Sequence, residues 1–302
     1  MKVFVAGASG AIGRPLIAEL IRRGHTVTGM SRSETGAQAL RQLGAAVVQI
    51  SAFDRPALQQ ALRESQAEVV IDELTALPSS PADMPSAAAG DRKLRLEGGG
   101  NLLAAAIACG VRRYVQQASG FFLQPGLGLA DEAENLAVAA SPGVSASART
   151  YTELEARLFA ATGLEGVALR YGFFYGPGTW YCATGAVADQ VRAQQQPIIG
   201  RGDGVWSWVH IDDAAIATAD ALTIPAGKYH IVDDEPVPVS RWLPAFARAV
   251  GAAAPAQVSE ADARATAGKD AVYYGTKLRG ASNAKAKATF GFAPRPLEWL
   301  VD

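Results

Sequence analysis

Three glycines recur at three-residue spacing near the start of the chain, in the segment Gly7-Ala8-Ser9-Gly10-Ala11-Ile12-Gly13. A phosphate-binding turn needs residues without Cβ where the backbone approaches an anion, and a helix whose first N–H groups point at that anion. A short apolar run, Lys2 to Ala6, precedes the glycines, and apolar residues at helical spacing follow them. This context predicts a dinucleotide site. The residues expected to line it are Gly7, Ser9, Gly10, Ala11, Ile12 and Gly13.

The residue after the second predicted strand indicates which dinucleotide binds. An acidic residue there would accept hydrogen bonds from the adenosine ribose of NAD, whereas a basic residue would pair with the 2′-phosphate of NADP. The sequence reads Met30-Ser31-Arg32-Ser33, with no carboxylate. Because Arg32 can form a bidentate contact with phosphate, NADP(H) is favoured and NAD(H) stays open. The alternative is that Arg32 is a solvated loop residue.

Strand and helix patterns alternate along the first 171 residues. Strands are predicted over residues 2–6, 25–30, 46–50, 68–72, 113–118 and 166–171, and the helices between them include 37–43, 55–64, 98–109 and 152–161. Helical crossovers imply parallel pairing, so we expect an α/β fold with a Rossmann-type, doubly wound sheet.

The alternation weakens from about Gly172. We therefore expect a dinucleotide-binding core over residues 1–171 and a smaller, mainly substrate-binding lobe over residues 172–302, with some segments returning to the core. Two stretches rich in small residues, 77–90 and 121–148, are predicted to be mobile loops at the mouth of the site.

The composition favours a small-molecule ligand. Lys and Arg together number 28 against 29 Asp and Glu, so the net charge of −1 gives no reason to expect nucleic acid or an anionic membrane as partner. Cys109 and Cys182 are isolated, and the three histidines do not cluster, which argues against a disulfide framework and a metal site. The chain has no signal peptide or membrane-spanning pattern, so we expect a soluble, cytoplasmic protein.

The GxxGxxG spacing resembles the extended and atypical branch of the short-chain dehydrogenase/reductases, the NAD-dependent epimerase/dehydratase-like family. The resemblance also covers residues 69–76, 101–119, 169–178, 205–213 and 282–294. It implies that the backbone at Leu74, Thr75 and Ala76 passes beside the nicotinamide ribose. It also suggests an adenine contact at Asp54, although Asp54-Arg55-Pro56 is equally a good helix start.

The same resemblance implies a catalytic serine, tyrosine and lysine, and the sequence departs from it at the lysine. Ser119 matches the serine and Tyr151 the tyrosine, but Glu155 stands where the lysine is expected. A nearby carboxylate would raise the pKa of the tyrosine, the opposite of what the usual mechanism needs. The run from Thr152 to Glu155 also fits a capping box, which predicts a structural role for Glu155 at a helix start. Whether Tyr151 is catalytic stays open.

Three functions fit these observations. The first is hydride transfer between NADP(H) and a carbonyl or alcohol carbon of a small, fairly apolar metabolite. The second is a sugar-nucleotide epimerase or dehydratase, for which Arg192, Arg201 and Arg279 are the available cations. The third is an NADP-binding sensor or structural protein that has lost the lysine. Helices near 91–109 and 152–161 occupy places where relatives dimerise, so a homodimer is expected. The residues expected to line the substrate site are Phe121, Tyr175, Trp180 and Trp206.

Overall fold

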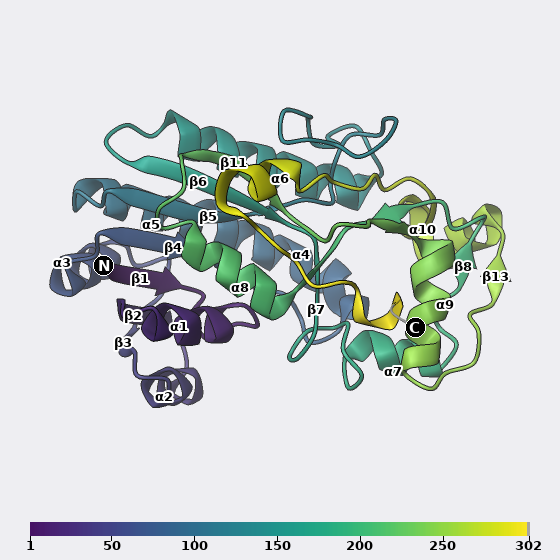
Figure 1. Cartoon of the computed structure of the whole chain (residues 1–302), viewed down its shortest axis with the longest axis horizontal. Helices are drawn as coiled ribbons and strands as arrows, with labels where there is room; N and C mark the ends of the chain where they lie inside the picture. The colour runs from purple at the N-terminus through teal and green to yellow at the C-terminus, as the bar shows by residue number, and fades with distance from the viewer. Residues whose placement is uncertain (301–302) are drawn as a thin grey trace.

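A seven-stranded parallel sheet forms the centre of the protein, whose computed structural model describes residues 1–300 (Figure 1). The strand order is β11-β6-β5-β4-β1-β2-β3, and every neighbouring pair is parallel. The strands are β1 (Lys2–Ala6), β2 (Thr26–Ser31), β3 (Ala46–Gln49), β4 (Val69–Asp72), β5 (Arg113–Ser119), β6 (Glu165–Tyr171) and β11 (Gly227–Ile231). The predicted α/β, Rossmann-type sheet is confirmed.

The sheet has one strand more than the six expected from the sequence. The additional strand, β11, pairs with β6 at one edge and comes from the second half of the chain. Its sequence is only five residues long and contains Gly227, Lys228 and His230, so it lacks the apolar run that marks the central strands. Edge strands need no such run, because one side of them has no neighbouring strand.

Helices cover both faces of the sheet, which explains why β1 is apolar at consecutive positions. Val3 and Val5 pack in the hydrophobic cluster formed with α1, α2, α8 and α11, whereas Phe4 and Ala6 pack in the cluster on the opposite face, with α3, α5 and α6. These helices are α1 (Gly13–Arg22), α2 (Glu34–Gln42), α3 (Arg55–Ser65), α5 (Gly99–Ala108), α6 (Pro142–Ala160), α8 (Ile211–Asp220) and α11 (Ala284–Phe290).

Beyond one end of the sheet, shorter elements form a smaller lobe (Figure 1). This lobe has a hydrophobic cluster of its own, which includes Trp206, Trp208, Trp242 and Phe246. The segments of this smaller lobe are β7 (Phe173–Tyr175), α7 (Ala186–Arg192), β8 (Ile198–Ile199), β9 (Val205–Trp206), β10 (Trp208–His210), β12 (Val237–Pro238), α9 (Val239–Ala249), β13 (Gln257–Val258), α10 (Glu260–Thr276) and η3 (Glu298–Leu300). Between its segments the chain returns to the sheet through α8, β11 and α11.

Both stretches predicted to be loops contain helix. Residues 81–83 form η1 (Pro81–Asp83), and a continuous helical path follows through α4 (Met84–Lys93), the π-helical turn η2 (Leu94–Gly98) and α5. In the second stretch α6 already begins at Pro142. The small residues of both stretches show no apolar periodicity, yet alanine is the best helix former and proline is favoured in the first turn.

The early start of α6 makes the capping-box interpretation of Thr152 and Glu155 wrong. Both residues lie well inside α6, and the Thr152 hydroxyl donates to the Ala148 carbonyl. Glu155 instead forms a bidentate ion pair with Arg170 of β6, with N–O distances of 2.6 and 2.7 Å. Both side chains are buried, and Lys228 Nζ of β11 lies 3.6 Å from the second carboxylate oxygen. Glu155 thus joins α6 to the sheet.

We predict that Glu155→Gln destabilises the protein by about 3–5 kcal/mol, because it leaves the Arg170 guanidinium buried without a counter-charge. The matched control is Glu153→Gln, which removes an exposed carboxylate of the same helix and should cost less than about 1 kcal/mol. Urea unfolding of the three proteins measures the difference. Equal losses in both variants would contradict the structural role of Glu155.

Candidate functional site

The glycine loop lies between β1 and α1. At two of its three glycines, the surrounding backbone leaves no room for a side chain. Gly7 has a φ of +79°, and a Cβ there would lie 2.3 Å from the Glu73 carbonyl oxygen. A Cβ on Gly13 would lie 2.3 Å from the Ala8 carbonyl oxygen. These two glycines are therefore required by the packing of the loop itself.

Gly10 is different, because the protein leaves room for a side chain there. It is exposed, and a Cβ would approach only the Gly7 carbonyl oxygen, at 3.1 Å. Next to it α1 starts without a side-chain cap at Ile12 and without an acidic residue in its first turn. The Arg14 amide donates to the Gly10 carbonyl at 3.3 Å and Pro15 has no N–H, so the Gly13 amide, which has no backbone acceptor within residues 1–300, is the first-turn donor left for an anion. The missing side chain of Gly10 keeps that approach open.

Two arginines lie on the segments that flank this loop. Arg32 directly follows β2 and is exposed. Ser9 lies beside the start of α2, which follows the turn that carries Arg32, because a Cβ on Gly36 would be 3.0 Å from Ser9 Cβ. Arg14, in the first turn of α1, is also exposed and donates to the Ser9 carbonyl at 3.2 Å. Arg14 was not predicted from the sequence, although its place one residue after Gly13 could have suggested it.

Asp54 caps a helix. Its carboxylate accepts a hydrogen bond from the Ala57 amide at 3.1 Å, at the start of α3. The side chain is exposed, so an adenine contact remains a prediction that the capping bond does not oppose.

The segment after β4 runs directly beside the glycine loop, as the contact between Gly7 and the Glu73 carbonyl shows. Leu74 is buried and its amide donates to the Asp72 carboxylate, whereas Thr75 and Ala76 are half-buried. The Ala76 amide donates to Asp91 at 2.7 Å. The fold thus brings this predicted cofactor segment to the loop.

Glu73, which was not selected from the sequence, is a buried carboxyl beneath the glycine loop. Tyr171 donates a hydrogen bond to its Oε1 at 3.0 Å, and Oε2 has no partner within residues 1–300. Burial raises the pKa of Glu73 to about 8, and the neighbouring Asp72 adds to the increase. The raised pKa favours the protonated, uncharged form of Glu73, which places no negative charge beside the glycine loop.

Ser119 and Tyr151 come from adjoining elements, the end of β5 and the middle of α6. Ser119 is buried, and its hydroxyl accepts a hydrogen bond from the Phe121 amide at 3.4 Å. The ring of Tyr151 is half-buried beside Phe122, with ring centres 6.1 Å apart. Burial raises the pKa of Tyr151, while the positive charge of Arg95 opposes that increase.

Arg95 is a further residue of the site that was not predicted. It lies in the π-helical turn η2, and its guanidinium carbon is 5.1 Å from the centre of the Tyr151 ring. Hydrogen bonds to Asp91, at 2.7 Å, and to Gln117, at 3.0 Å, fix its position. Because η2 falls in a region that carries no clear apolar period, no local pattern indicates that Arg95 points inward.

The predicted substrate residues separate into two groups. Phe121 stacks on Phe173 at 4.1 Å, and Phe173 stacks in turn on Trp206 at 4.0 Å. Trp180 is half-buried and donates to the Pro78 carbonyl, which ties the segment after β4 to the smaller lobe. Tyr175, by contrast, is 1% exposed and donates to the Pro296 carbonyl, so it lies in the core of the lobe. Phe121 and Trp180 remain the better candidates for substrate contact.

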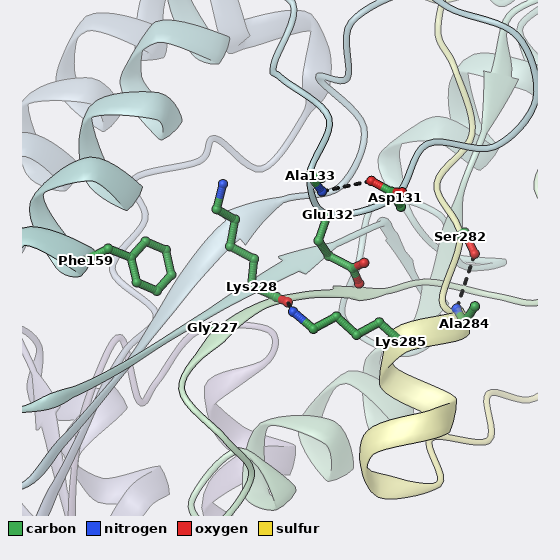
Figure 2. A pocket seen from close by; sticks show the side chains of 9 residues that line it. All are labelled: Asp131, Glu132, Ala133, Phe159, Gly227, Lys228, Ser282, Ala284 and Lys285. Carbon is green, nitrogen blue, oxygen red and sulfur yellow. Dashed lines mark hydrogen bonds between the residues drawn. The ribbon is translucent and has the colours of Figure 1, made fainter.

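A separate surface hollow of about 690 Å³ adjoins the edge strand β11 (Figure 2). It is lined by Asp131, Glu132, Ala133, Phe159, Gly227, Lys228, Ser282, Ala284 and Lys285, none of which is a predicted site residue. The Lys285 ammonium donates to the Lys228 carbonyl across it. This hollow is therefore not part of the candidate dinucleotide site.

Within residues 1–300, no group of three or more His, Cys, Asp and Glu side chains is arranged to hold a metal ion. No helix in the same part of the chain has the length and apolarity needed to cross a membrane.

Comparison with known proteins agrees with this geometry. Residues 3–232 match the model of the NAD dependent epimerase/dehydratase family. A curated relative, the 3-diazoavenalumate denitrifying reductase of a Streptomyces species, is 40% identical over 99% of this chain and 98% of its own length.

Two solved structures show the same fold over nearly the whole chain. The UDP-glucose 4-epimerase of Thermotoga maritima, with UDP-glucose, has a TM-score of 0.78 at 20% identity and covers 99% of this chain and 95% of its own. The UDP-glucose 4-epimerase of Thermus thermophilus, with NAD, has a TM-score of 0.74 at 25% identity and covers 98% and 94%. The chain belongs to the NAD-dependent epimerase/dehydratase family and is an oxidoreductase of the short-chain dehydrogenase/reductase type.

Proposed function

We propose that this protein is an NADP(H)-dependent reductase that delivers hydride to a carbonyl carbon of a small, fairly apolar metabolite. The observation that carries the proposal is the uncapped start of α1, with the exposed Arg32 on the neighbouring turn. The first feature suits a pyrophosphate and the second a 2′-phosphate. Arg14, which is exposed in the first turn of α1, adds a second cation beside the glycine loop for the cofactor's phosphate groups.

The preference for NADP(H) departs from the family's usual cofactor, and the turn after β2 supports the departure. Residues Ser31, Arg32 and Ser33 offer no carboxylate to the ribose hydroxyls. The Ser31 hydroxyl donates to the Ser33 carbonyl within the turn, and the Ser33 hydroxyl accepts from the Gly36 amide at the start of α2. An NAD(H) complex would gain no bidentate acceptor there, whereas a phosphate would gain the guanidinium of Arg32.

A sugar-nucleotide substrate is the weaker candidate, because each of the three arginines considered for its diphosphate already has protein partners. Arg192 bonds to Asp189 and two carbonyls, and Arg201 pairs with Asp203. Arg279 holds carbonyls of the loop before α6 and pairs with Glu134. The aromatic surface at Phe121 and Trp180 suits an apolar ring better.

A second candidate reaction is the reductive removal of nitrogen from an aromatic diazo group, and the Streptomyces reductase favours it. Hydride added to the terminal nitrogen of an aryl diazonium ion gives an aryl diazene, which loses N₂ and leaves hydrogen on the ring. No oxygen atom of the substrate needs a proton in this sequence. Glu155 in place of a lysine is compatible with such chemistry.

We also propose a homodimer and a cytoplasmic location. Ile107 of α5 and Phe159 of α6 are each 42% exposed, on the helices where a dimer interface is expected. Both cysteines are free thiols, which suits a reducing compartment.

The cofactor proposal predicts calorimetric titrations in which NADPH binds more tightly than NADH. Arg32→Ala should weaken NADPH binding about tenfold or more, through loss of a charge-assisted contact, and leave NADH binding unchanged. Arg41→Ala is the matched control, because Arg41 is an exposed arginine at the far end of α2. Gly10→Ala should weaken both nucleotides without unfolding the protein, since its Cβ meets only one backbone oxygen. If neither nucleotide binds to the wild type, the proposal is wrong.

The two candidate reactions predict different effects of Tyr151→Phe on the rate. Loss of the phenolic proton should lower the rate of NADPH-dependent carbonyl reduction about 100-fold or more. Reduction of an aryl diazonium probe should change little. Steady-state rates with an aromatic ketone, an aromatic aldehyde and an aryl diazonium salt distinguish the two. NADPH binding without turnover of any probe would instead favour the sensor function.

A further inference from the structure

The carbonyl reaction proposed above requires a positive charge near Tyr151 that position 155 does not supply. Glu155 is negatively charged and faces Arg170 of β6, with which it forms two hydrogen bonds. Arg170 donates to Glu155 through Nε and Nη2, and its Nη1 contacts the Glu134 carbonyl and His230 Nε2. A phenol buried as Tyr151 is would hold its proton too strongly without a nearby cation.

Arg95 lies where such a cation is needed. Its side chain is 6% exposed, and its guanidinium sits over the face of the Tyr151 ring at 5.1 Å. The π-helical turn that contains it interrupts the regular helix between α4 and α5, and such turns often place a side chain in a site that a regular helix would miss. Asp91 and Gln117 hold the guanidinium from two different elements, which fixes the charge in place.

The titratable groups that face Tyr151 come from four parts of the chain. They are Arg95 of η2, Asp91 of α4, Glu73 just after β4, and Tyr274 of α10. Burial raises the pKa of Glu73 to about 8, which favours the uncharged form of this carboxyl at pH 7. The Tyr151 hydroxyl has no hydrogen-bond partner among the side chains of residues 1–300, which leaves it free for a substrate.

We propose that Arg95 is a positioning residue that stabilises the ionised form of Tyr151, and that it takes over the role of the lysine expected at position 155. This inference rests on the proposed carbonyl reduction. Bound NADPH would supply the hydride for the carbonyl carbon as the C=O π bond breaks, and the Tyr151 hydroxyl would give its proton to the oxygen. The phenolate formed is stabilised by the guanidinium over its ring and regains a proton from solvent.

The test measures the ionisation of residue 151 directly, without any turnover. A trifluorinated tyrosine introduced at position 151 has a lower intrinsic pKa than tyrosine, and its fluorine NMR signal reports that site alone. Arg95→Gln should raise this pKa by about one unit or more, because it removes an adjacent opposite charge. Asp91→Asn should lower it, since Asp91 is a like charge to the phenolate and the amide keeps its shape.

The matched control is Arg149→Gln, which removes an exposed arginine of the same helix, α6. It should leave the pKa of residue 151 unchanged, because solvent screens its charge. Arg95→Lys should keep the pKa close to that of the unsubstituted protein. In each variant the pH above which carbonyl reduction declines should move in the same direction as the measured pKa.

An effect of Arg95→Gln no larger than that of Arg149→Gln, in protein that still binds NADPH, would overturn the inference. If Arg95→Gln does not fold, Arg95→Lys and Asp91→Asn decide the question, and an unchanged pKa in Asp91→Asn would contradict it. Failure of the proposed function would be seen separately, as absence of NADPH binding or of carbonyl turnover in the wild type.

Discussion

The buried ion pair between Glu155 and Arg170 constrains the rest of the candidate site. It joins the middle of α6 to β6, the strand that lies next to β5, whose last residue is Ser119. Tyr151 lies one helical turn before Glu155, and its ring is beside Phe122, shortly after the carboxyl end of β5. The pair fixes the helix that carries the tyrosine, but it places an anion where the related enzymes are expected to have a lysine. Any positive charge that assists Tyr151 must then come from a different element.

The second constraint is the close approach of the glycine loop to the segment after β4. Gly7 touches the backbone of Glu73, and Glu73 is in turn bonded to Tyr171 of β6. The glycine loop, the segment expected beside nicotinamide and the strand end expected near the substrate are thus linked through one buried carboxyl. A protonated Glu73 makes this linkage compatible with an anionic cofactor, because it adds no repulsive charge.

Much of the sheet could be predicted from the sequence, and the failures have identifiable physical causes. Strands β1 and β4 are almost wholly buried and consist mainly of apolar residues, and the glycine loop is marked by glycines that its backbone geometry requires. The edge strand β11 has no such run. The start of α6 was placed too late because alanine and serine at residues 145–148 carry helix propensity without an apolar period.

The site residues that sequence reasoning missed depend on tertiary contacts. Arg95 and Glu73 were not selected, because nothing in their local sequence shows that both are buried beside Tyr151 and the glycine loop. Glu155 has a structural role, as predicted, but its partner is Arg170 and not the backbone at a helix start. A long-range ion pair has no local signature, whereas a capping box does.

The most direct test of the proposed reaction follows the hydride itself. The purified protein is incubated with NADPH in which both hydrogens at C4 of the nicotinamide are deuterium, together with the aromatic ketone and aldehyde probes. Mass spectrometry then measures deuterium in the alcohol product. We predict one deuterium on the former carbonyl carbon, where it cannot exchange with water. Oxidised cofactor without deuterium in any product, or no change in the cofactor at all, would contradict hydride transfer to a carbonyl as the function of this site.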